Sequence, residues 1–340
     1  AAIQERAAHG VFGYSIVPEE WSQAYMDWWQ RRHGFSMEKE WLVFCTGVVP
    51  AISSMVRKLT TVGENVLVQT PVYNIFFNSI VNNGRNIVES PLQYDGNTYH
   101  MDFEDLEQKL SDPQTTLMIL CNPHNPVGRI WNREELGRVG DLCRKYHVIV
   151  ISDEIHCDLT SPGQEYIPFA SVSESCRKCS ITCIAPTKAF NLAGLQTAAV
   201  VVPDPNLRHK VWRGLNTDEV AEPNSFAAEA AVAAFTKGEA WLNALREYIQ
   251  ENKNFVEKEV PQISPVSSQA TYLMWLDCRK MQGCATEFTR YLREHTGLYL
   301  SEGRQYGENG NSFIRMNIAC PRSRLEDGLK RLAEGIRDYF

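Results

Sequence analysis

The stretch Val148-Ile-Val-Ile-Ser-Asp-Glu-Ile-His156 runs from four apolar residues straight into two carboxylates. A short, continuous apolar run is typical of a strand that is buried on both faces of a parallel sheet. Carboxylates directly after such a strand cost free energy unless a cation or hydrogen-bond donors meet them. Ligands of parallel sheets bind beyond the carboxyl ends of the strands, so we predict a site at Asp153. The alternative is that Asp153 only caps a helix.

Similar apolar runs alternate with amphipathic stretches through much of the chain. The predicted strands cover residues 65–69, 85–89, 115–121, 148–151, 180–185 and 197–202, with helices such as 102–110 and 133–146 between them. The alternation predicts an α/β fold, in which helices cover both faces of a mostly parallel sheet. After residue 222, long helical patterns surround two strand-like runs, at 272–276 and 312–318. This change predicts a smaller α+β domain.

Composition narrows the class of protein. The 340 residues carry a formal net charge of −7, and basic residues form no block longer than a pair such as Arg31-Arg32, which argues against a general nucleic-acid binder. No apolar run approaches the ~18 residues of a membrane span, so no membrane partner is expected. Ten cysteines, several inside strand-like runs, and the lack of a signal-peptide pattern favour a reduced, cytoplasmic protein.

The spacing Cys176-x-x-Cys179-x-x-x-Cys183 invites comparison with a zinc knuckle. It lacks a second cysteine pair at a suitable distance, and Cys183 lies inside a predicted strand. We therefore predict no metal site and expect the cysteines to be buried or incidental thiols.

Two further strand ends carry groups suited to chemistry. Cys121-Asn-Pro-His-Asn-Pro-Val-Gly128 predicts a rigid turn, because proline fixes φ and glycine permits unusual φ, and its asparagines are thereby held in place. Lys188 follows the strand at 180–185, where a desolvated lysine acts as a nucleophile toward carbonyl compounds. The plain alternatives are an ordinary strand-to-helix turn and a solvated lysine whose stem covers apolar surface.

A lysine nucleophile, a buried acid and a phosphate cradle are together what proteins contribute to pyridoxal 5′-phosphate (PLP) chemistry. The cradle is predicted at Gly47, which precedes a helix with Pro50 in its first turn and so presents free N–H groups to an anion. Neither the pattern G-x-G-x-x-G nor G-x-x-x-x-G-K-[ST] occurs in the sequence, so dinucleotide and P-loop sites are not predicted.

The sequence resembles the fold type I PLP enzymes of the class I/II aminotransferase superfamily. The motifs that carry the resemblance are Asn125-Pro-Val-Gly128, Ser152-Asp-Glu-Ile-His156, Thr187-Lys-Ala-Phe-Asn-Leu-Ala-Gly194 and Phe313-Ile-Arg-Met-Asn317. Within the superfamily it is similar to the MalY/PatB branch of cystathionine β-lyases and related carbon–sulfur (C–S) lyases. The resemblance extends from Val11 to the last helix.

The resemblance implies the PLP-dependent transferase fold of type I, with a seven-stranded, mostly parallel sheet between helices and a smaller α+β C-terminal domain. The implied organisation is an N-terminal segment (1–17), a large PLP-binding domain (18–235) and a small domain (236–340).

The resemblance also implies a role for each site residue, with Lys188, Asp153 and Tyr73 as the catalytic residues. Lys188 would bond the cofactor and later move protons, Asp153 would pair with the pyridinium nitrogen, and Tyr73 would stack on the ring. The other implied contacts are Asn125 and His156 with the phenolic oxygen, Gly47, Val48 and Thr187 with the phosphate, Arg315 with the substrate's α-carboxylate, and Tyr14 with the phosphate and substrate in the neighbouring subunit of a homodimer.

Two positions depart from the family pattern. Gln196 stands where many aminotransferases of the superfamily have a phosphate-binding Arg, which favours the β-lyase branch. Ala185 stands where many have Ser, which leaves one phosphate contact unassigned. Residues 1–8 have the pattern of the later part of a helix without a start signal, so the chain is expected to lack its natural beginning.

The reaction implied is α,β-elimination, by which L-cystathionine or a related cysteine S-conjugate would give pyruvate, ammonia and a thiol. Two alternatives stay open: a PLP-dependent aminotransferase of a small amino acid at the same site, and a PLP-fold regulatory or binding protein with little turnover. The sequence does not identify the physiological thioether, because apolar pocket residues discriminate between substrates by only a few kcal/mol.

Overall fold

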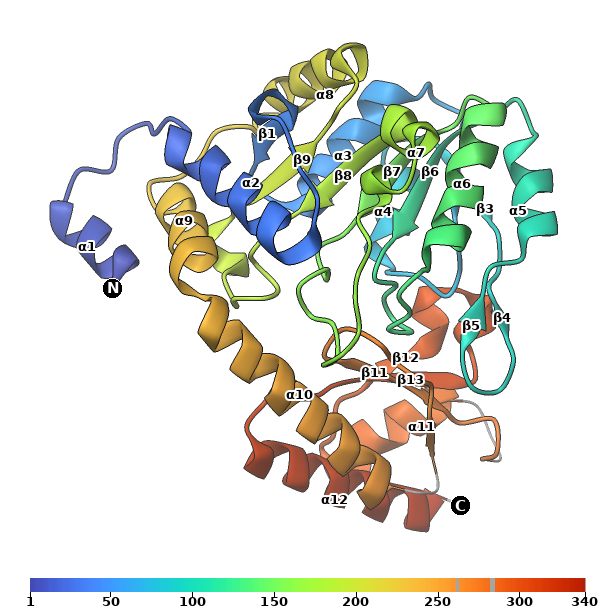
Figure 1. The fold of residues 1–340 in the computed structure, drawn as a ribbon. Helices are drawn as coiled ribbons and strands as arrows, with labels where there is room; N and C mark the ends of the chain where they lie inside the picture. Colours follow the sequence, from blue (N-terminus) through green and yellow to red (C-terminus); the bar gives the residue numbers. More distant parts are fainter. Residues whose placement is uncertain (261–262, 282–284, 340) are drawn as a thin grey trace.

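The computed structural model describes residues 1–260, 263–281 and 285–339, and its larger part is built around a seven-stranded sheet (Figure 1). The strands, in spatial order, are β1 (Leu42–Cys45), β9 (Ala198–Val201), β8 (Ser180–Ile184), β7 (Ile149–Asp153), β6 (Thr115–Cys121), β2 (Asn65–Val68) and β3 (Asn86–Glu89). The strands from β8 to β3 are mutually parallel, whereas β9 is antiparallel to both β8 and β1. The predicted seven strands and mostly parallel sheet are confirmed.

Alternate residues of the buried strands point to opposite faces of the sheet, and helices cover both faces. Val66 and Ile151 pack with one set of helices, α3 (Val48–Leu59), α4 (Ile75–Val81) and α8 (Pro205–Thr217). Leu67 and Val150 pack with the other set, α5 (Phe103–Leu110), α6 (Arg133–Lys145) and α7 (Glu174–Cys179). On that second face, α2 (Glu19–His33) and α9 (Ala227–Lys237) cover the end of the sheet formed by β8, β9 and β1.

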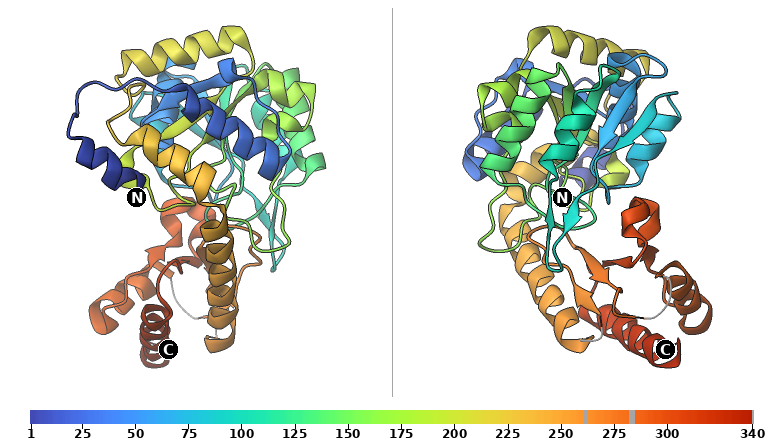
Figure 2. Two further views of the ribbon diagram at one scale, coloured as in Figure 1. Left: turned by 60° about the vertical axis from the view of Figure 1, so that its left-hand side comes forward. Right: turned by 90° about the vertical axis from the view of Figure 1, so that its right-hand side faces the viewer.

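The smaller part is attached through α10 (Glu239–Glu259), which runs from the large part along the small one (Figure 2). Its antiparallel sheet has the order β10 (Ser264–Pro265), β11 (Leu273–Asp277), β13 (Phe313–Asn317) and β12 (Ser301–Glu302). This sheet packs with α11 (Ala285–Tyr291) and α12 (Arg322–Tyr339). One apolar cluster continues from α2 and α9 into β11, β13 and α12, so the two parts share a core. The predicted domain limits, at residues 17 and 235, stay predictions.

The remaining elements are α1 (Ala2–His9) and a hairpin of β4 (Gln93–Tyr94) with β5 (Tyr99–His100). No helix in the described ranges is long and apolar enough to cross a bilayer. Of the ten cysteines, Cys284 lies outside the described residues, and the other nine are free. All nine are buried except Cys320, which is half-buried, and Cys183 lies within β8 as expected.

The structure corrects the helix-capping interpretation of Asp153. After β7 the chain forms a turn at residues 155–158 rather than a helix, and Asp153 Oδ1 accepts a hydrogen bond from the N–H of Ile155 at 3.1 Å. The carboxylate therefore stays at the end of its strand. The first helical pattern predicted after residue 222 begins only at Ala227, because Asn224 Oδ1 accepts from the N–H of Phe226 and forms a turn before it.

Candidate active site

A cavity of about 430 Å³ opens at the carboxyl ends of the central strands, facing the small part. Cys121 and Asp153 are the last residues of β6 and β7, Gly47 follows β1, and Lys188 follows β8. Arg315 reaches the same cavity from β13 of the small sheet. Nine of the ten predicted site residues line it, namely Gly47, Val48, Tyr73, Asn125, Asp153, His156, Thr187, Lys188 and Arg315. The strand ends thus meet where parallel-sheet topology predicts.

Asp153 is a buried acid, with 4% of its surface exposed. Burial raises the pKa of Asp153 to about 6, although the Ile155 N–H and the positive charge of Lys188 both act to lower it. A carboxylate in such a place is stabilised by a further positive charge. The cavity therefore suits a ligand that presents a protonated nitrogen to Asp153.

Lys188 lies on a turn whose backbone is held by its own hydrogen bonds. The N–H of Phe190 donates to Pro186 O, and that of Leu192 donates to Thr187 O, both at 2.9 Å. Thr187 and Ala189 are buried on either side, while Lys188 is half-buried and faces the cavity. The turn thus presents the Lys188 amine to the cavity that Asp153 also lines.

The first turn of α3 forms the predicted anion cradle. Gly47 is its N-cap, and a Cβ there would lie 3.3 Å from Pro50 Cδ, so the close turn favours glycine. N–H groups in the first turn of a helix have no partner inside the helix and attract anions. Gln196 also borders the cavity, whereas Ala185 packs in the apolar cluster under α3.

Asn125 and Arg315 join the two walls of the cavity. Arg315 Nη1 donates to Asn125 Oδ1 at 3.2 Å, and the guanidinium lies over the Tyr306 ring, 4.7 Å from its centroid. The two residues are far apart in the sequence, so this contact depends on the packing of the small part against the large one. Arg315 is thereby held where it can bind a carboxylate in the cavity.

His156 is buried, and among the described residues one of its ring nitrogens has no partner. Burial lowers the pKa of His156 to about 3, and the positive charges of Lys188 and Arg315 lower it further. Its Nδ1 atom has no hydrogen-bond partner within the described parts of the chain. The Tyr272 ring stands edge-on to it, with centroids 5.9 Å apart. The orphaned nitrogen therefore fits a hydrogen bond to a bound group.

Among the cavity residues that were not predicted as site residues are Tyr272 and Cys121. Tyr272 directly precedes β11 and so lies at the amino end of a strand, where the rule of inspecting carboxyl ends does not apply. Cys121 is the first residue of the predicted turn. Its Sγ accepts a hydrogen bond from the N–H of Asn125 at 3.4 Å. Tyr73 was predicted and lines the cavity, where burial and the charge of Asp153 raise the pKa of its hydroxyl.

Tyr14 is the predicted site residue that does not line the cavity of its own chain. It is fully exposed, in the segment between α1 and α2. In Figure 1 that segment lies at the outer side of α2 and α9. The expected contact with a neighbouring subunit stays a prediction.

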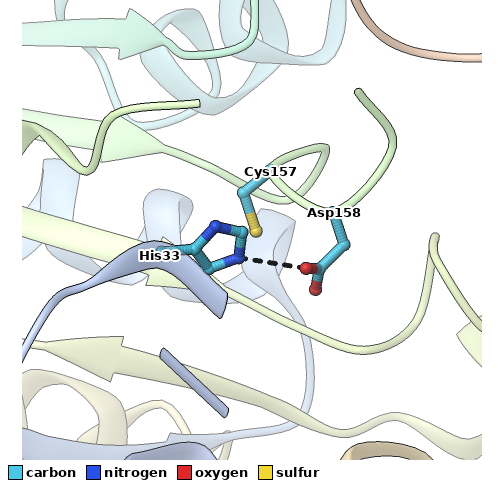
Figure 3. A group of neighbouring side chains, drawn as sticks. All are labelled: His33, Cys157 and Asp158. Atoms are coloured by element: carbon cyan, nitrogen blue, oxygen red, sulfur yellow. Dashed lines mark hydrogen bonds and ion pairs between the residues drawn. The ribbon is translucent and has the colours of Figure 1, made fainter. Parts of the chain in front are cut away.

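A second cluster that the sequence did not indicate consists of His33, Cys157 and Asp158 (Figure 3). One possible metal-binding atom from each lies within 4.8 Å of the others. The Asp158 carboxylate already contacts His33 Nε2 at 3.0 Å and Arg32 Nε at 3.1 Å, and both of its oxygens accept from Trp28 Nε1. Asp158 thus acts as a buried acceptor that ties α2 to the turn behind Asp153.

The side chains and backbone groups that line the cavity fit PLP. Asp153 suits a pyridinium nitrogen, the first turn of α3 suits a phosphate, and the orphaned Nδ1 of His156 suits a ring oxygen. Lys188 supplies the amine to which such a cofactor bonds. These four groups lie on one cavity, although their positions in the sequence span residues 47–188.

Comparison with known proteins agrees with a PLP site in this cavity. The family model "Aminotransferase class I and II" matches residues 1–332. Cystathionine beta-lyase PatB of Bacillus subtilis is 42% identical over 97% of this chain and 87% of that protein, and protein MalY of Escherichia coli is 32% identical over 99% and 87%. The crystal structure of cystalysin from Treponema denticola, which contains PLP, matches with a TM-score of 0.97 and 30% identity over 100% of this chain and 87% of that chain.

The agreement covers almost the whole chain, the sheet topology and the cofactor that the cavity fits. The chain therefore belongs to the class I and II aminotransferase family of fold type I enzymes, in the branch that includes PatB and MalY, and its cofactor is pyridoxal 5′-phosphate.

Proposed function

We propose that this chain is a PLP-dependent C–S β-lyase that acts on L-cystathionine or related cysteine S-conjugates and releases pyruvate, ammonia and a thiol. The observation that carries the proposal is one cavity that holds Lys188, Asp153 and Arg315 in a chain 42% identical to a cystathionine β-lyase. Homocysteine would be the thiol from cystathionine, and sulfide the product from cysteine.

Arg315 binds the α-carboxylate of the substrate in this proposal. Its planar guanidinium suits two parallel hydrogen bonds, and Asn125 and the Tyr306 ring orient it. The substrate's α-amine then lies toward Lys188, because the two side chains border the same cavity. This orientation exposes the Cα proton to the lysine.

Bound PLP supplies the electron-withdrawing ring that stabilises negative charge at Cα. Asp153 keeps a proton on the ring nitrogen, and burial of the carboxylate strengthens that interaction. Lys188 Nζ, as the free amine, would take the proton from Cα, and the thiol would leave from Cβ. Hydrolysis of the remaining three-carbon unit gives pyruvate and ammonia.

The other predicted residues hold the cofactor. Tyr73 would stack on the ring, and Asn125 and His156 would contact its phenolic oxygen. Neutral His156 can donate from one nitrogen and accept at the other, so its uncharged state suits this role. The phosphate contacts proposed are those of Gly47, Val48 and Thr187.

We also propose a homodimer in a reducing cytoplasm. Tyr14 and its neighbours Val11, Phe12 and Ile16 are all exposed, which suits a segment that lies against a second subunit. Tyr14 would then contact the phosphate and substrate in the neighbouring cavity. The nine described free thiols suit a reducing compartment.

The aminotransferase alternative needs a keto-acid acceptor, whereas elimination does not. Incubation of the holoenzyme with L-cystathionine alone is expected to give equal amounts of pyruvate, ammonia and homocysteine, far in excess of the enzyme. A reaction that stops after one turnover per site would refute the lyase. A Lys188→Ala variant that kept its full biological effect in cells would support the regulatory alternative instead.

A further inference from the structure

Lys253 is a buried lysine on the inner side of α10 that the proposed mechanism does not use. Only 3% of its surface is exposed. Its Nζ donates to Ser161 Oγ at 3.2 Å, to Ser268 Oγ at 3.1 Å and to Ala270 O at 3.4 Å. All three acceptors are uncharged, so Lys253 is not half of an ion pair with them.

The acceptors of Lys253 lie on two segments, 159–161 and 268–271, which we call the junction segments. The first belongs to the large part and follows the turn that carries His156; the second belongs to the small part and directly precedes Tyr272. Backbone hydrogen bonds pair them, from Ser161 N to Gln269 O at 2.8 Å and from Thr271 N to Leu159 O at 2.7 Å. Lys253 therefore bonds to both sides of this pairing.

A second residue of α10 acts on the same place. Arg246 lies two helical turns before Lys253, and its Nε donates to Thr160 O at 2.8 Å while Nη2 donates to Thr160 Oγ1 at 2.9 Å. Residues seven apart lie on one face of a helix. The inner face of α10 thus holds the junction segments through two cations.

Junction segment 268–271 also packs directly against the turn that carries Asn125. The N–H groups of Gln269 and Ala270 donate to Gly128 O at 2.8 and 3.0 Å. Gly128 has φ of +71°, and a Cβ there would meet Ser268 Oγ and lie 2.8 Å from Ala270 O. The close approach requires glycine. Movement of segment 268–271 would therefore be transmitted to the turn that carries Asn125.

Burial of the Lys253 charge works against folding. Desolvation lowers the pKa of Lys253 to about 8, with a smaller opposing effect from Glu257. A charge taken out of water costs free energy, and hydrogen bonds to uncharged acceptors offset that cost only in part. Packing alone therefore does not account for a lysine at this position.

We infer that Lys253 is a positioning residue, which holds the junction segments together so that Tyr272 and Arg315 of the small part stay opposite Asn125 and His156 of the large part. The inference rests on the proposed function only in that the cavity must bind an amino acid through Arg315. Loss of the lysine would loosen the substrate end of the cavity, while Gly47, Asp153 and Lys188, at the ends of β1, β7 and β8, would keep their geometry.

The test compares Lys253→Met with Lys258→Met, an exposed lysine of the same helix. L-alanine serves as the probe, because it binds through its amine and carboxylate but carries no leaving group; binding is followed by the absorbance of the bound cofactor. We expect Lys253→Met to weaken L-alanine binding about tenfold. The cofactor spectrum in the absence of L-alanine should be unchanged, and the thermal midpoint should not fall, because the substitution removes a buried charge. Lys258→Met should change binding less than twofold.

Unchanged L-alanine affinity in Lys253→Met would overturn the inference. If that variant fails to fold, Ser268→Ala decides, because it removes one acceptor and keeps the charge; it is expected to weaken L-alanine binding about threefold, and wild-type affinity would overturn the inference. A wild-type enzyme that binds L-alanine but does not eliminate cystathionine would refute the proposed function alone. Absence of any response to L-alanine in the wild type would overturn both.

Discussion

Asp153 combines a cost in stability with a chemical use. Burial raises the pKa of Asp153 from 3.8 to about 6, so the folded chain without cofactor keeps a proton that the unfolded chain releases. The contribution of this group to stability is therefore full below pH 3.8 and is lost as pH rises through 6. At neutral pH the buried carboxylate is charged and is stabilised by a positive partner, which the cofactor supplies.

Asp153→Asn tests that account. Without cofactor, the variant should gain stability relative to wild type between pH 4 and 7, by roughly 2–3 kcal/mol, because the amide does not ionise. The holoenzyme's kcat/KM should fall about 100-fold or more. Chemical unfolding at several pH values and steady-state kinetics measure the two effects, with the exposed Asp141→Asn on α6 as control. A stability difference that does not vary with pH would contradict the buried-acid account.

Glu154, the next residue, is fully buried and does not line the cavity. Its carboxyl group accepts from Ser152 Oγ at 2.7 Å, from Phe169 N at 2.9 Å and from the Tyr166 hydroxyl. Burial nevertheless raises the pKa of Glu154 to about 8. Its contribution to stability is full below pH 4.5 and is lost as pH rises through 8.

Glu154→Gln should therefore become more stable relative to wild type as pH increases from 5 to 9, since the amide oxygen can still accept from Ser152 and Phe169 and the amide does not ionise. The measurement is the free energy of unfolding in urea at pH 5, 7 and 9, taken as the difference between variant and wild type. A difference that is constant or falls with pH would show that Glu154 is ionised in the folded chain.

At the scale of the element, α2 is held to the turn behind Asp153 by charge as well as by apolar contacts. Arg32 and His33 at its end, and Trp28 one turn earlier, all contact Asp158. Removing the carboxylate leaves a buried guanidinium with less compensation. Asp158→Ala should therefore cost about 3–5 kcal/mol of unfolding free energy.

Urea unfolding checks this value, with Asp27→Ala as the matched control on the exposed side of α2. The control should cost less than about 0.5 kcal/mol. Equal effects of the two substitutions would mean that the cluster in Figure 3 does not hold the helix.

The elements also show which parts of the site could be predicted from sequence. Strand ends are local signals, because an apolar run and the residues after it are neighbours in the chain, and Asp153, Lys188 and the turn at Asn125 were found in this way. Contacts between distant segments carry no such signal. The partners His33 and Asp158 are 125 residues apart, and the hydrogen bonds of Lys253 depend on how α10 crosses the junction.

Strand direction illustrates the same limit at the edge of the sheet. The apolar run at 197–202 predicted a strand correctly but not its orientation, since β9 follows β8 without a crossover helix and is antiparallel to it. Periodicity fixes which face a residue takes, whereas direction depends on the connection. Tyr272 was missed for a related reason, because it reaches the cavity only through the docking of the small part.

At the scale of the whole molecule, the proposed homodimer makes a complementation test possible. If Tyr14 serves the neighbouring cavity, Tyr14→Ala and Lys188→Ala dimers are each inactive, but a mixed dimer has one cavity that lacks both side chains and one that is intact. Random exchange of subunits should restore about a quarter of the wild-type sites, because half of the dimers are mixed. Lyase activity after co-refolding measures the recovery, and no recovery would place Tyr14 outside a shared site.

The central claim of the account is that the cavity at the strand ends holds PLP on Lys188. Borohydride reduction of the holoenzyme makes the bond between PLP and its lysine permanent, and peptide mass mapping then identifies that lysine. We predict that the added mass lies on the peptide containing Lys188 and is missing from the Lys188→Ala variant. A label on any other lysine, or a PLP-loaded protein that carries no label, would contradict the assignment of this cavity as the active site.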